Sequence, residues 1–547
     1  MRHSIRNQLL VLAAAGLCAC TRGDPKTVKY WVQKVQGEHT EREKKADMAH
    51  LREVAKTTKE ADVAGQVASL LHDQPGNVQQ LAAEVLGELG DKSAVAPLLA
   101  AIDISRGSGA DHATEEQNHA NRAIADALGK LGDPKATPGL LKLLKSKDNY
   151  TVINAISSLG EVRDPAAVKA LSEIATDTSI ETFINKKAIM ALGEIGDPSA
   201  IPAVHEMLYQ ERKGISFYAE SSFALYEIGK PSTSILLSDI QGKDPKFMSW
   251  AKEHGVLKGA ILAKTAQILG DLNDRSSEHA LLELLAYKDE DAQLQYATRM
   301  QAADALGRMR SKAAVKPMEE MLGDEEVAAR NTYYRALRFI GDRSVVATAM
   351  KRASAKESIG YREDAYKTVA LLGNAGELNA YDALLAGEDK RLDGECKDAE
   401  IGDADCTQQK KDVEGRLKLY RGALATGCAT GQLPCWEQKL ADANPFVRER
   451  AALELGHSGK AEALPQLIST IQKPLDGKSN DEVSQQDEAR FAAILAVHWL
   501  LNDGAKPANA AEIAAKLEKQ ADEERKATAT MRSAEDVKRL AVRLRRA

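Results

Sequence analysis

The chain has 547 residues, of which 44% are hydrophobic and only 4% aromatic, and its 74 lysines and arginines are outnumbered by 80 acidic residues. So few aromatic rings favour thin layers of closely packed helices over a β-sandwich or a β-barrel. The formal net charge of -6 gives no overall attraction for nucleic acid or anionic lipid, which argues against a nucleic-acid-binding protein.

The first 19 residues are typical of a secretory signal peptide. Two arginines precede an apolar stretch, residues 9–17, that is too short to span a bilayer as a helix. Residues 17–20, Leu-Cys-Ala-Cys, resemble the bacterial lipobox, in which a small residue precedes the cysteine that receives the lipid. Cys20 fits this position better than Cys18, because an alanine precedes it. An ordinary cleaved signal peptide with two incidental cysteines is the alternative.

Lipidation of Cys20 would attach the mature chain to a membrane, because each acyl methylene buried in the bilayer contributes about 0.8 kcal/mol. Thr21 rather than aspartate follows the cysteine, which favours the outer membrane, on its periplasmic side or at the cell surface. Residues 20–44 are predicted to form the lipidated tether and a first helix. No later stretch is apolar for long enough to predict a transmembrane helix.

From residue 45 onward a short motif, Leu-Gly-x-Leu-Gly-Asp, recurs at steps of mostly about 31 to 34 residues. Apolar residues three and four apart precede and follow each copy, so each repeat is predicted to be a helix hairpin. The clearest copies begin at Leu86, Leu128, Leu159, Leu192 and Leu225, and weaker copies begin at Leu269, Leu306, Leu337 and Leu455.

The residues that follow the first helix of each hairpin have separate physical roles. Gly132 is predicted to end a helix in the left-handed conformation that glycine adopts without steric cost. Asp133 then caps the next helix, and Pro134 fits its first turn. A hairpin of this length cannot bury its own apolar faces, so neighbouring hairpins must stack. The predicted fold is therefore all-α, a right-handed α-solenoid of stacked helix hairpins.

These repeats resemble HEAT repeats, in particular the short form often labelled phycobilisome-lyase-like, and the resemblance covers roughly residues 45–505. It implies a HEAT solenoid over residues 45–385 and further HEAT repeats over residues 437–505. HEAT proteins include scaffolds, transport receptors, inhibitors and a few enzymes, so the resemblance implies a fold more strongly than a function.

In the HEAT family the helix that carries the motif lines the concave side. Acidic side chains in the last turn of a helix oppose its dipole at about 0.3 to 1 kcal/mol each, which favours a compensating basic partner. We therefore expect a groove that binds a basic protein segment; the alternative is that these acids pair with basic residues of the neighbouring repeat. The residues two after each leucine are Glu88, Lys130, Glu161, Glu194, Glu227, Asp271 and Arg308, of which the five acids are the predicted groove residues.

Three insertions, residues 103–120, 241–258 and 287–299, fall on one edge of the predicted solenoid and are either contact loops or plain solvent loops. The histidines and glutamate of residues 112–119 have helical metal-ligand spacing, but the polar, glycine-bearing insert favours a solvated loop. Residues 389–400 match a calcium loop only in part, since Arg391 occupies a ligand position. No metal is predicted.

Residues 386–436 are predicted to be an insertion with a degraded repeat, and they contain the four cysteines left after the signal peptide and the lipidated residue. In an exported protein these predict two disulfides with three possible connectivities. We favour sequential pairing because both spans are short: Cys396 with Cys406, and Cys428 with Cys435. Spacings of ten and seven residues do not suit a zinc site.

Residues 506–547 lose the repeat pattern and are predicted to form a helical cap or tail. Ser533 starts a helix, and the basic C-terminal end favours the helix dipole. A docking arm is the alternative.

No catalytic signature such as a P-loop, a nucleophile elbow or a zinc-binding His-Glu-x-x-His is present. His205-Glu206 is a lone copy of the pairs found in deoxyhypusine hydroxylase. The sequence therefore predicts a lipid-anchored, monomeric HEAT-repeat scaffold or adaptor without a cofactor, which binds an unidentified protein at the bacterial envelope. The alternatives are a metal-dependent or lyase-type enzyme built on a HEAT solenoid and a purely structural envelope component.

Overall fold

The computed structural model divides the chain into two units, residues 1–228 and residues 229–547. The signal-like segment and Cys20 lie outside the described residues, so the signal peptide and the lipid anchor stay predictions. The structure describes residues 24–72, 75–105, 111–323, 327–399, 402–476, 479–527 and 532–546.

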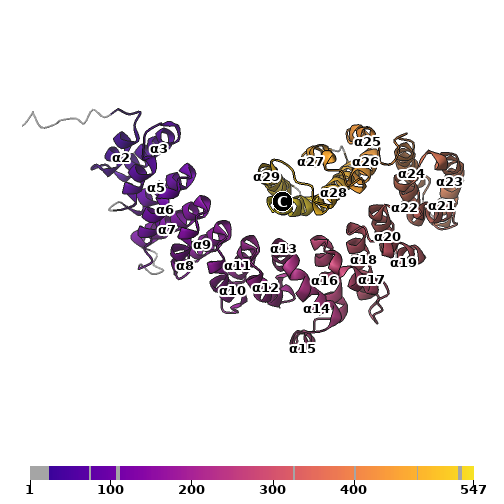
Figure 1. Ribbon diagram of the computed structural model, residues 1–547, viewed down its shortest axis with the longest axis horizontal. Coiled ribbons are helices and arrows are strands. Elements are labelled where there is room, and N and C mark those ends of the chain that lie inside the picture. The colour runs from indigo at the N-terminus through magenta and orange to yellow at the C-terminus, as the bar shows by residue number, and fades with distance from the viewer. Residues whose placement is uncertain are drawn as a thin grey trace, which may run out of the picture. The chain divides into compact units, whose positions relative to one another are not determined.

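Unit 1 is a stack of helix hairpins in two layers (Figure 1). One layer consists of the helices that carry the motif, here called the motif helices: α5 (Gly76–Leu89), α7 (His112–Leu131), α9 (Asn149–Val162), α11 (Thr182–Ile195) and α13 (Tyr218–Ile228). The other layer consists of α6 (Val95–Ala100), α8 (Thr137–Leu143), α10 (Val168–Thr176) and α12 (Ile201–Leu208). The stack begins with α2 (Val28–Gln36), α3 (Glu41–Thr57) and α4 (Val63–Ala68), and a hairpin of β1 (Glu211–Arg212) and β2 (Ile215–Ser216) precedes α13.

The turn that follows each motif helix has the predicted chemistry. Gly132 adopts φ 58°, and the Asp133 carboxylate accepts a hydrogen bond from the backbone N–H of Lys135. Where the motif has no glycine at this position, Arg163 and Asn273 take the same left-handed conformation, with φ 58° and 51°. The turn geometry is therefore kept with asparagine, which tolerates this conformation, and even with arginine, which is poorly suited to it.

The stack is closely packed around small side chains. The anchoring leucines, such as Leu159, are completely buried, and in α5, α7, α9 and α11 a glycine follows the leucine where the next motif helix approaches. A Cβ added at Gly160 would lie 3.1 Å from the Cα of Ala191 on α11 and would collide with the Glu194 carboxylate. The first glycine of the motif thus permits close helix packing.

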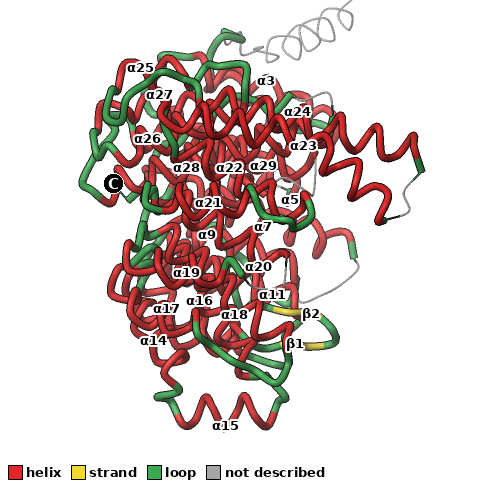
Figure 2. Tube along the Cα trace, turned by 90° about the vertical axis from the view of Figure 1, so that its right-hand side faces the viewer, coloured by secondary structure: helices red, strands yellow, loops and turns green. Residues whose placement is uncertain are grey.

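Unit 2 continues the same alternation but curls back on itself (Figures 1 and 2). The indole N–H of Trp499 donates to the carbonyl of Arg308 at 2.6 Å, and the Phe339 and Phe491 rings lie 5.8 Å apart. Helix α28 therefore packs across α18 and α20. The helices are α14 (Thr233–Gln241), α15 (Pro245–Glu253), α16 (Lys258–Leu272), α17 (Glu278–Leu285), α18 (Ala292–Arg308), α19 (Val315–Met321), α20 (Val327–Ile340), α21 (Val345–Ala353), α22 (Ile359–Leu372), α23 (Leu378–Asp398), α24 (Asp403–Leu424), α25 (Leu433–Lys439), α26 (Pro445–His457), α27 (Leu464–Ile471), α28 (Asn480–Asn502), α29 (Ala510–Ala527) and α30 (Arg532–Arg545).

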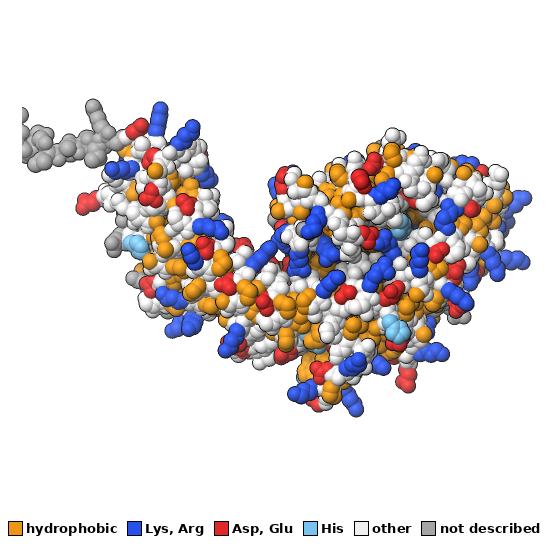
Figure 3. Space-filling model, in the orientation of Figure 1, with side chains coloured by type: hydrophobic (Ala, Val, Ile, Leu, Met, Phe, Trp, Pro, Cys, Tyr) orange, Lys and Arg blue, Asp and Glu red, His pale blue; other side chains and the backbone are white. Residues whose placement is uncertain are grey.

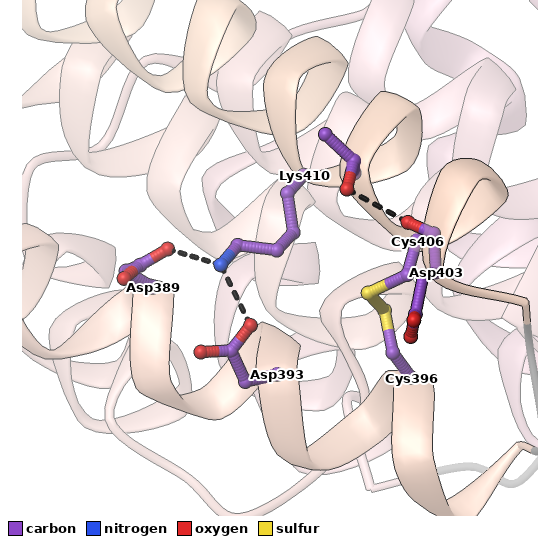
Figure 4. The surroundings of a disulfide bond; sticks show 7 residues. Asp389, Asp393, Cys396, Asp403, Cys406 and Lys410 are labelled. Carbon is purple, nitrogen blue, oxygen red and sulfur yellow. Dashed lines mark hydrogen bonds and ion pairs between the residues drawn. A yellow bond between two sulfur atoms is a disulfide. The ribbon is translucent and has the colours of Figure 1, made fainter.

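Both disulfides form with the sequential pairing that the sequence favours, Cys396 with Cys406 and Cys428 with Cys435. The first joins the end of α23 to the start of α24, two long antiparallel helices (Figure 4). The partial calcium loop is not a loop over residues 389–398, which lie in α23; residue 400 lies outside the described residues. Lys410 of α24 occupies the space between the Asp389 and Asp393 carboxylates, at 2.5 and 2.7 Å.

Two of the three predicted insertions mainly lengthen motif helices. Helix α7 starts within residues 103–120, and α18 starts within residues 287–299. The third, residues 241–258, contains the separate helix α15. Within the described ranges, no helix is both long enough and apolar enough to cross a bilayer.

Candidate protein-binding face

The five predicted groove acids do not form one open row. Glu88 contacts basic residues of the neighbouring helix α3, Arg52 at 3.2 Å and Lys56 at 3.1 Å, which is the alternative that the sequence left open. Glu227 is buried in α13, and Asp271 is buried in α16 of unit 2. Glu161 on α9 is exposed and Glu194 on α11 is partly exposed.

In unit 2 the C-terminal helix α30 contacts Asp271, the predicted groove acid on α16. The Asp271 carboxylate, 8% exposed, lies 3.2 Å from the Arg539 guanidinium of α30 and 3.4 Å from Arg308 of α18. Asp536 of α30 lies 3.4 Å from Arg308. Burial raises the pKa of Asp271 although both arginines act to lower it. A basic residue of the same chain, on α30, therefore pairs with the buried acid. The C-terminal segment predicted to be a cap or tail is packed against unit 2 at this point.

In unit 1 the corresponding acids lie over glycines of the preceding motif helix. The carboxylates of Glu161 and Glu194 occupy the space that side chains at Gly129 and Gly160 would need. The pKa of Glu161 is raised, first because neighbouring helices reduce its hydration and then because Asp126 carries the same charge; Lys130 acts to lower it. An incoming cation would relieve this repulsion.

Two exposed aromatic side chains on the same helices were missed by the sequence analysis. Tyr150 on α9 is 64% exposed and Phe183 on α11 is 57% exposed, so most of each side chain faces solvent. A cation from the same or the neighbouring helix lies against each ring: Arg122 is 4.8 Å from the Tyr150 ring centre, and Lys187 is 5.7 Å from that of Phe183. Aromatic side chains are enriched at protein interfaces, so two exposed rings on adjacent helices can contribute to a binding surface.

The aromatic and acidic residues share a register. Tyr150 precedes Glu161, and Phe183 precedes Glu194, by eleven residues. Eleven residues correspond to about three helical turns, so each pair lies on one face of its helix, roughly 16 Å apart. Helices α9 and α11 are packed neighbours. We call the surface formed by Tyr150, Glu161, Phe183 and Glu194 the α9–α11 face; its repeated eleven-residue spacing was the signal available in the sequence.

The neighbouring helices α5 and α7 hold a cavity of about 160 Å³ on the same layer. Arg122 at its wall forms a two-pronged contact with Asp148, both at 2.8 Å, which fixes the guanidinium beside Tyr150. The cavity lining is Gln80, Glu84, His119, Arg122, Ala123, Asp126, Ala127 and Lys130.

The histidines considered as metal ligands contact different glutamates, His112 with Glu116 at 3.7 Å and His119 with Glu115 at 3.8 Å. Nowhere in the described ranges do three or more histidine, cysteine, aspartate or glutamate side chains form a group that could hold a metal ion.

His205, of the lone His-Glu pair, is buried in α12, where its ring meets the edge of Tyr209.

The two-layered stack and its exposed face define a helical-repeat solenoid with a surface suited to binding another macromolecule. Comparison with protein families specifies the repeat: residues 110–183 and 138–222 match HEAT repeats, and residues 78–103 match the PBS lyase HEAT-like repeat. The chain therefore contains HEAT repeats, as the sequence predicts. No curated protein matches the sequence.

Comparison with solved structures finds similar chains at low sequence identity. The Kap121p chain in complex with Pho4p is 10% identical, covering 98% of this chain and 67% of that one, with a TM-score of 0.46. The CpcE–CpcF phycocyanin lyase from Nostoc is 22% identical over 48% of this chain and 95% of that one, with a TM-score of 0.25. Human deoxyhypusine hydroxylase is 19% identical over 51% and 95%, with a TM-score of 0.22.

Proposed function

We propose that the protein is a HEAT-repeat scaffold or adaptor that binds a protein segment on the α9–α11 face of unit 1. The observation that carries the proposal is the repeated pairing of an exposed aromatic ring with an acid eleven residues later, on two adjacent helices. A preformed, rigid face of this kind loses little conformational entropy on binding.

The chemistry of the face specifies the partner segment. Rings at one end favour apolar side chains, and carboxylates about 16 Å away favour lysine or arginine. Unit 2 contains an internal example of this recognition, because Arg539 of α30 meets Asp271. Asp271 stands two residues after Leu269, as Glu161 stands two residues after Leu159. The partner segment is therefore an amphipathic segment with a basic end.

We also propose that the mature chain is anchored at Cys20 in the bacterial outer membrane, on the periplasmic side or at the cell surface. The lipobox-like sequence supports this location. Two disulfides support it further, because such bonds persist in oxidising compartments. In this arrangement the anchored monomer holds its partner beside the membrane.

The test is crosslinking in intact cells, followed by purification from the membrane fraction and mass spectrometry of the attached proteins. A Glu161→Arg/Glu194→Arg variant is expected to lose the partner, because its face repels a basic segment. The matched control is Glu173→Arg/Glu206→Arg, which makes the same charge change at exposed positions of the other layer, on α10 and α12. Equal recovery from both variants would exclude the α9–α11 face as the binding surface.

The anchor is tested separately with Cys20→Ala. Loss of this variant from the membrane fraction, with partner binding kept in the purified protein, is the expected result. Retention in the membrane fraction would contradict lipidation at Cys20 without bearing on the face.

A further inference from the structure

Helix α15 is an addition to the repeat between α14 and α16, within the insertion at residues 241–258. It begins at Pro245, and the carboxylate of Asp244 accepts hydrogen bonds from the backbone N–H groups of Lys246 and Phe247. Ala251 is its one buried residue. Helix α15 lies at an edge of unit 2, away from the stacked layers, at the bottom of Figures 1 and 2.

Aromatic side chains gather along this helix. The Phe247 and Trp250 rings lie 6.1 Å apart, and Trp250 stacks on His254 at 4.7 Å. Both Phe247 and Trp250 are half-buried, and Leu257, just after the helix, is 57% exposed. The apolar side of α15 is therefore only partly covered by unit 2.

Lysines surround this apolar side. Lys243, Lys246 and Lys252 are exposed, and none of them lies within ion-pair distance of any carboxylate that the structure describes. With Lys258, the insertion has four lysines against two acids, Asp244 and Glu253, in a chain whose net charge is -6. Basic and hydrophobic side chains lie together over α15 in Figure 3.

We propose that α15 docks on an anionic lipid surface. Phe247, Trp250 and Leu257 enter the interface between headgroups and acyl chains, and the lysines meet the lipid phosphates. A single projecting helix offers no groove for a folded partner, whereas a fluid, negatively charged surface needs no matching shape. This docking is independent of the α9–α11 face.

The test uses the expected mature chain from Thr21 onward, which lacks Cys20 and therefore carries no acyl group. Binding is measured by co-sedimentation with phosphatidylcholine vesicles that contain about 30% phosphatidylglycerol, and with pure phosphatidylcholine vesicles. We expect binding to the anionic vesicles, weaker binding to the neutral ones, and a decrease with added salt. No binding to anionic vesicles would overturn the proposal.

Lys246→Gln/Lys252→Gln is expected to weaken binding by about fivefold per lysine, or about 25-fold in total. The control is Lys516→Gln/Lys519→Gln, which removes two lysines from α29 of the same unit. An equal loss in both variants would reveal attraction by overall charge and overturn the proposal. Circular dichroism verifies that each variant is folded.

Trp250→Ala tests whether the aromatic side enters the membrane. The chain has four tryptophans, of which Trp436 and Trp499 are buried in the core and Trp31 is half-buried. Quenching of tryptophan fluorescence by brominated lipids is therefore measured in a Trp31→Phe background, where it is expected before Trp250→Ala is introduced and is expected to be lost afterwards. Unchanged quenching would show that α15 does not insert. If the α15 lysine variant instead loses binding to a single-stranded oligonucleotide while neither protein binds vesicles, the ligand is nucleic acid and the lipid proposal fails.

Discussion

The two units use the same position of the repeat in opposite ways. In unit 1, Glu161 is exposed and Glu194 is partly exposed, on the same two helices as the exposed rings of Tyr150 and Phe183. In unit 2, the equivalent Asp271 is buried against Arg539 of the chain's own C-terminal helix. The same position of the repeat therefore carries accessible acids on α9 and α11 of unit 1 and a buried acid that joins α16 to α30 in unit 2.

The strongest way to break this comparison is to reverse the charge on α30. Arg539→Glu would place a carboxylate beside buried Asp271 and remove one of its two cations. We expect the free energy of unfolding of unit 2 to fall by about 3 to 5 kcal/mol, because a buried charge is left without compensation. Hydrogen exchange should increase in α16, α28 and α30 and stay unchanged in unit 1.

Arg545→Glu is the control for this change, since Arg545 pairs with Glu518 at 2.7 Å in a more exposed place. Its effect should be about 1 kcal/mol or less. If Arg539→Glu lowers the free energy of unfolding no more than Arg545→Glu does, the contact of α30 with Asp271 does not stabilise unit 2, and α30 is a surface tail.

A second difference is that the stability of unit 2 should decrease at acidic pH, because this unit contains two histidines with lowered pKa values. Burial lowers the pKa of His457 to about 4, aided by Arg310 and opposed by the Phe339 carbonyl at 2.8 Å. Burial also lowers the pKa of His498 to about 3, aided by Arg543, Arg308 and Arg539.

Because both pKa values are below the unfolded value of about 6.5, the unfolded chain binds more protons and stability falls as the pH falls below 6.5. From pH 7 to pH 5 each histidine should cost unit 2 about 2 kcal/mol. Urea denaturation at the two pH values measures the loss. His457→Gln should show about half of it, and an unchanged pH dependence in this variant would contradict burial of the imidazole.

The sequence predicted the parts of this molecule that depend on local chemistry. The turn at Gly132 and Asp133 needs a left-handed residue and a capping oxygen, and both can be recognised from residue type alone. The disulfide pairing followed from short spans. The contact of Arg539 with Asp271 joins residues 268 apart and has no local signal, so the groove of unit 2 could not be distinguished from that of unit 1.

The candidate face was predicted only in part for the same reason. Glu161 and Glu194 were identified by their place in the motif, but whether an acid is paired, buried or exposed depends on the neighbouring helix. Tyr150 and Phe183 were missed, since apolar residues near the start of a helix ordinarily contribute to its core. Exposure is a tertiary property that the period of three and four residues does not determine.

Helix spacing gives a further comparison, between the tight stack of unit 1 and the α23–α24 hairpin of unit 2. Gly160→Ala should destabilise unit 1 by about 1 to 2 kcal/mol, because its Cβ overlaps α11 and the Glu194 carboxylate. Gly415→Ala in α24 meets nothing within 4 Å and should stabilise its helix by up to about 1 kcal/mol. Opposite shifts in melting temperature would verify both, whereas equal shifts would contradict the close approach of α9 and α11.

The smallest expected effect on stability is at the aromatic residues of the α9–α11 face, where the largest effect on binding is expected. Tyr150→Ala/Phe183→Ala removes rings that are more than half exposed, so the free energy of unfolding should change by less than about 0.5 kcal/mol. Affinity for the partner identified by crosslinking should fall by about tenfold per ring, as expected for exposed aromatic anchors. Calorimetry on the purified pair measures both quantities. A variant that is destabilised but still binds would show that these rings support the fold. Unit 1 would then not differ from unit 2 in presenting an exposed binding face, and the comparison would fail.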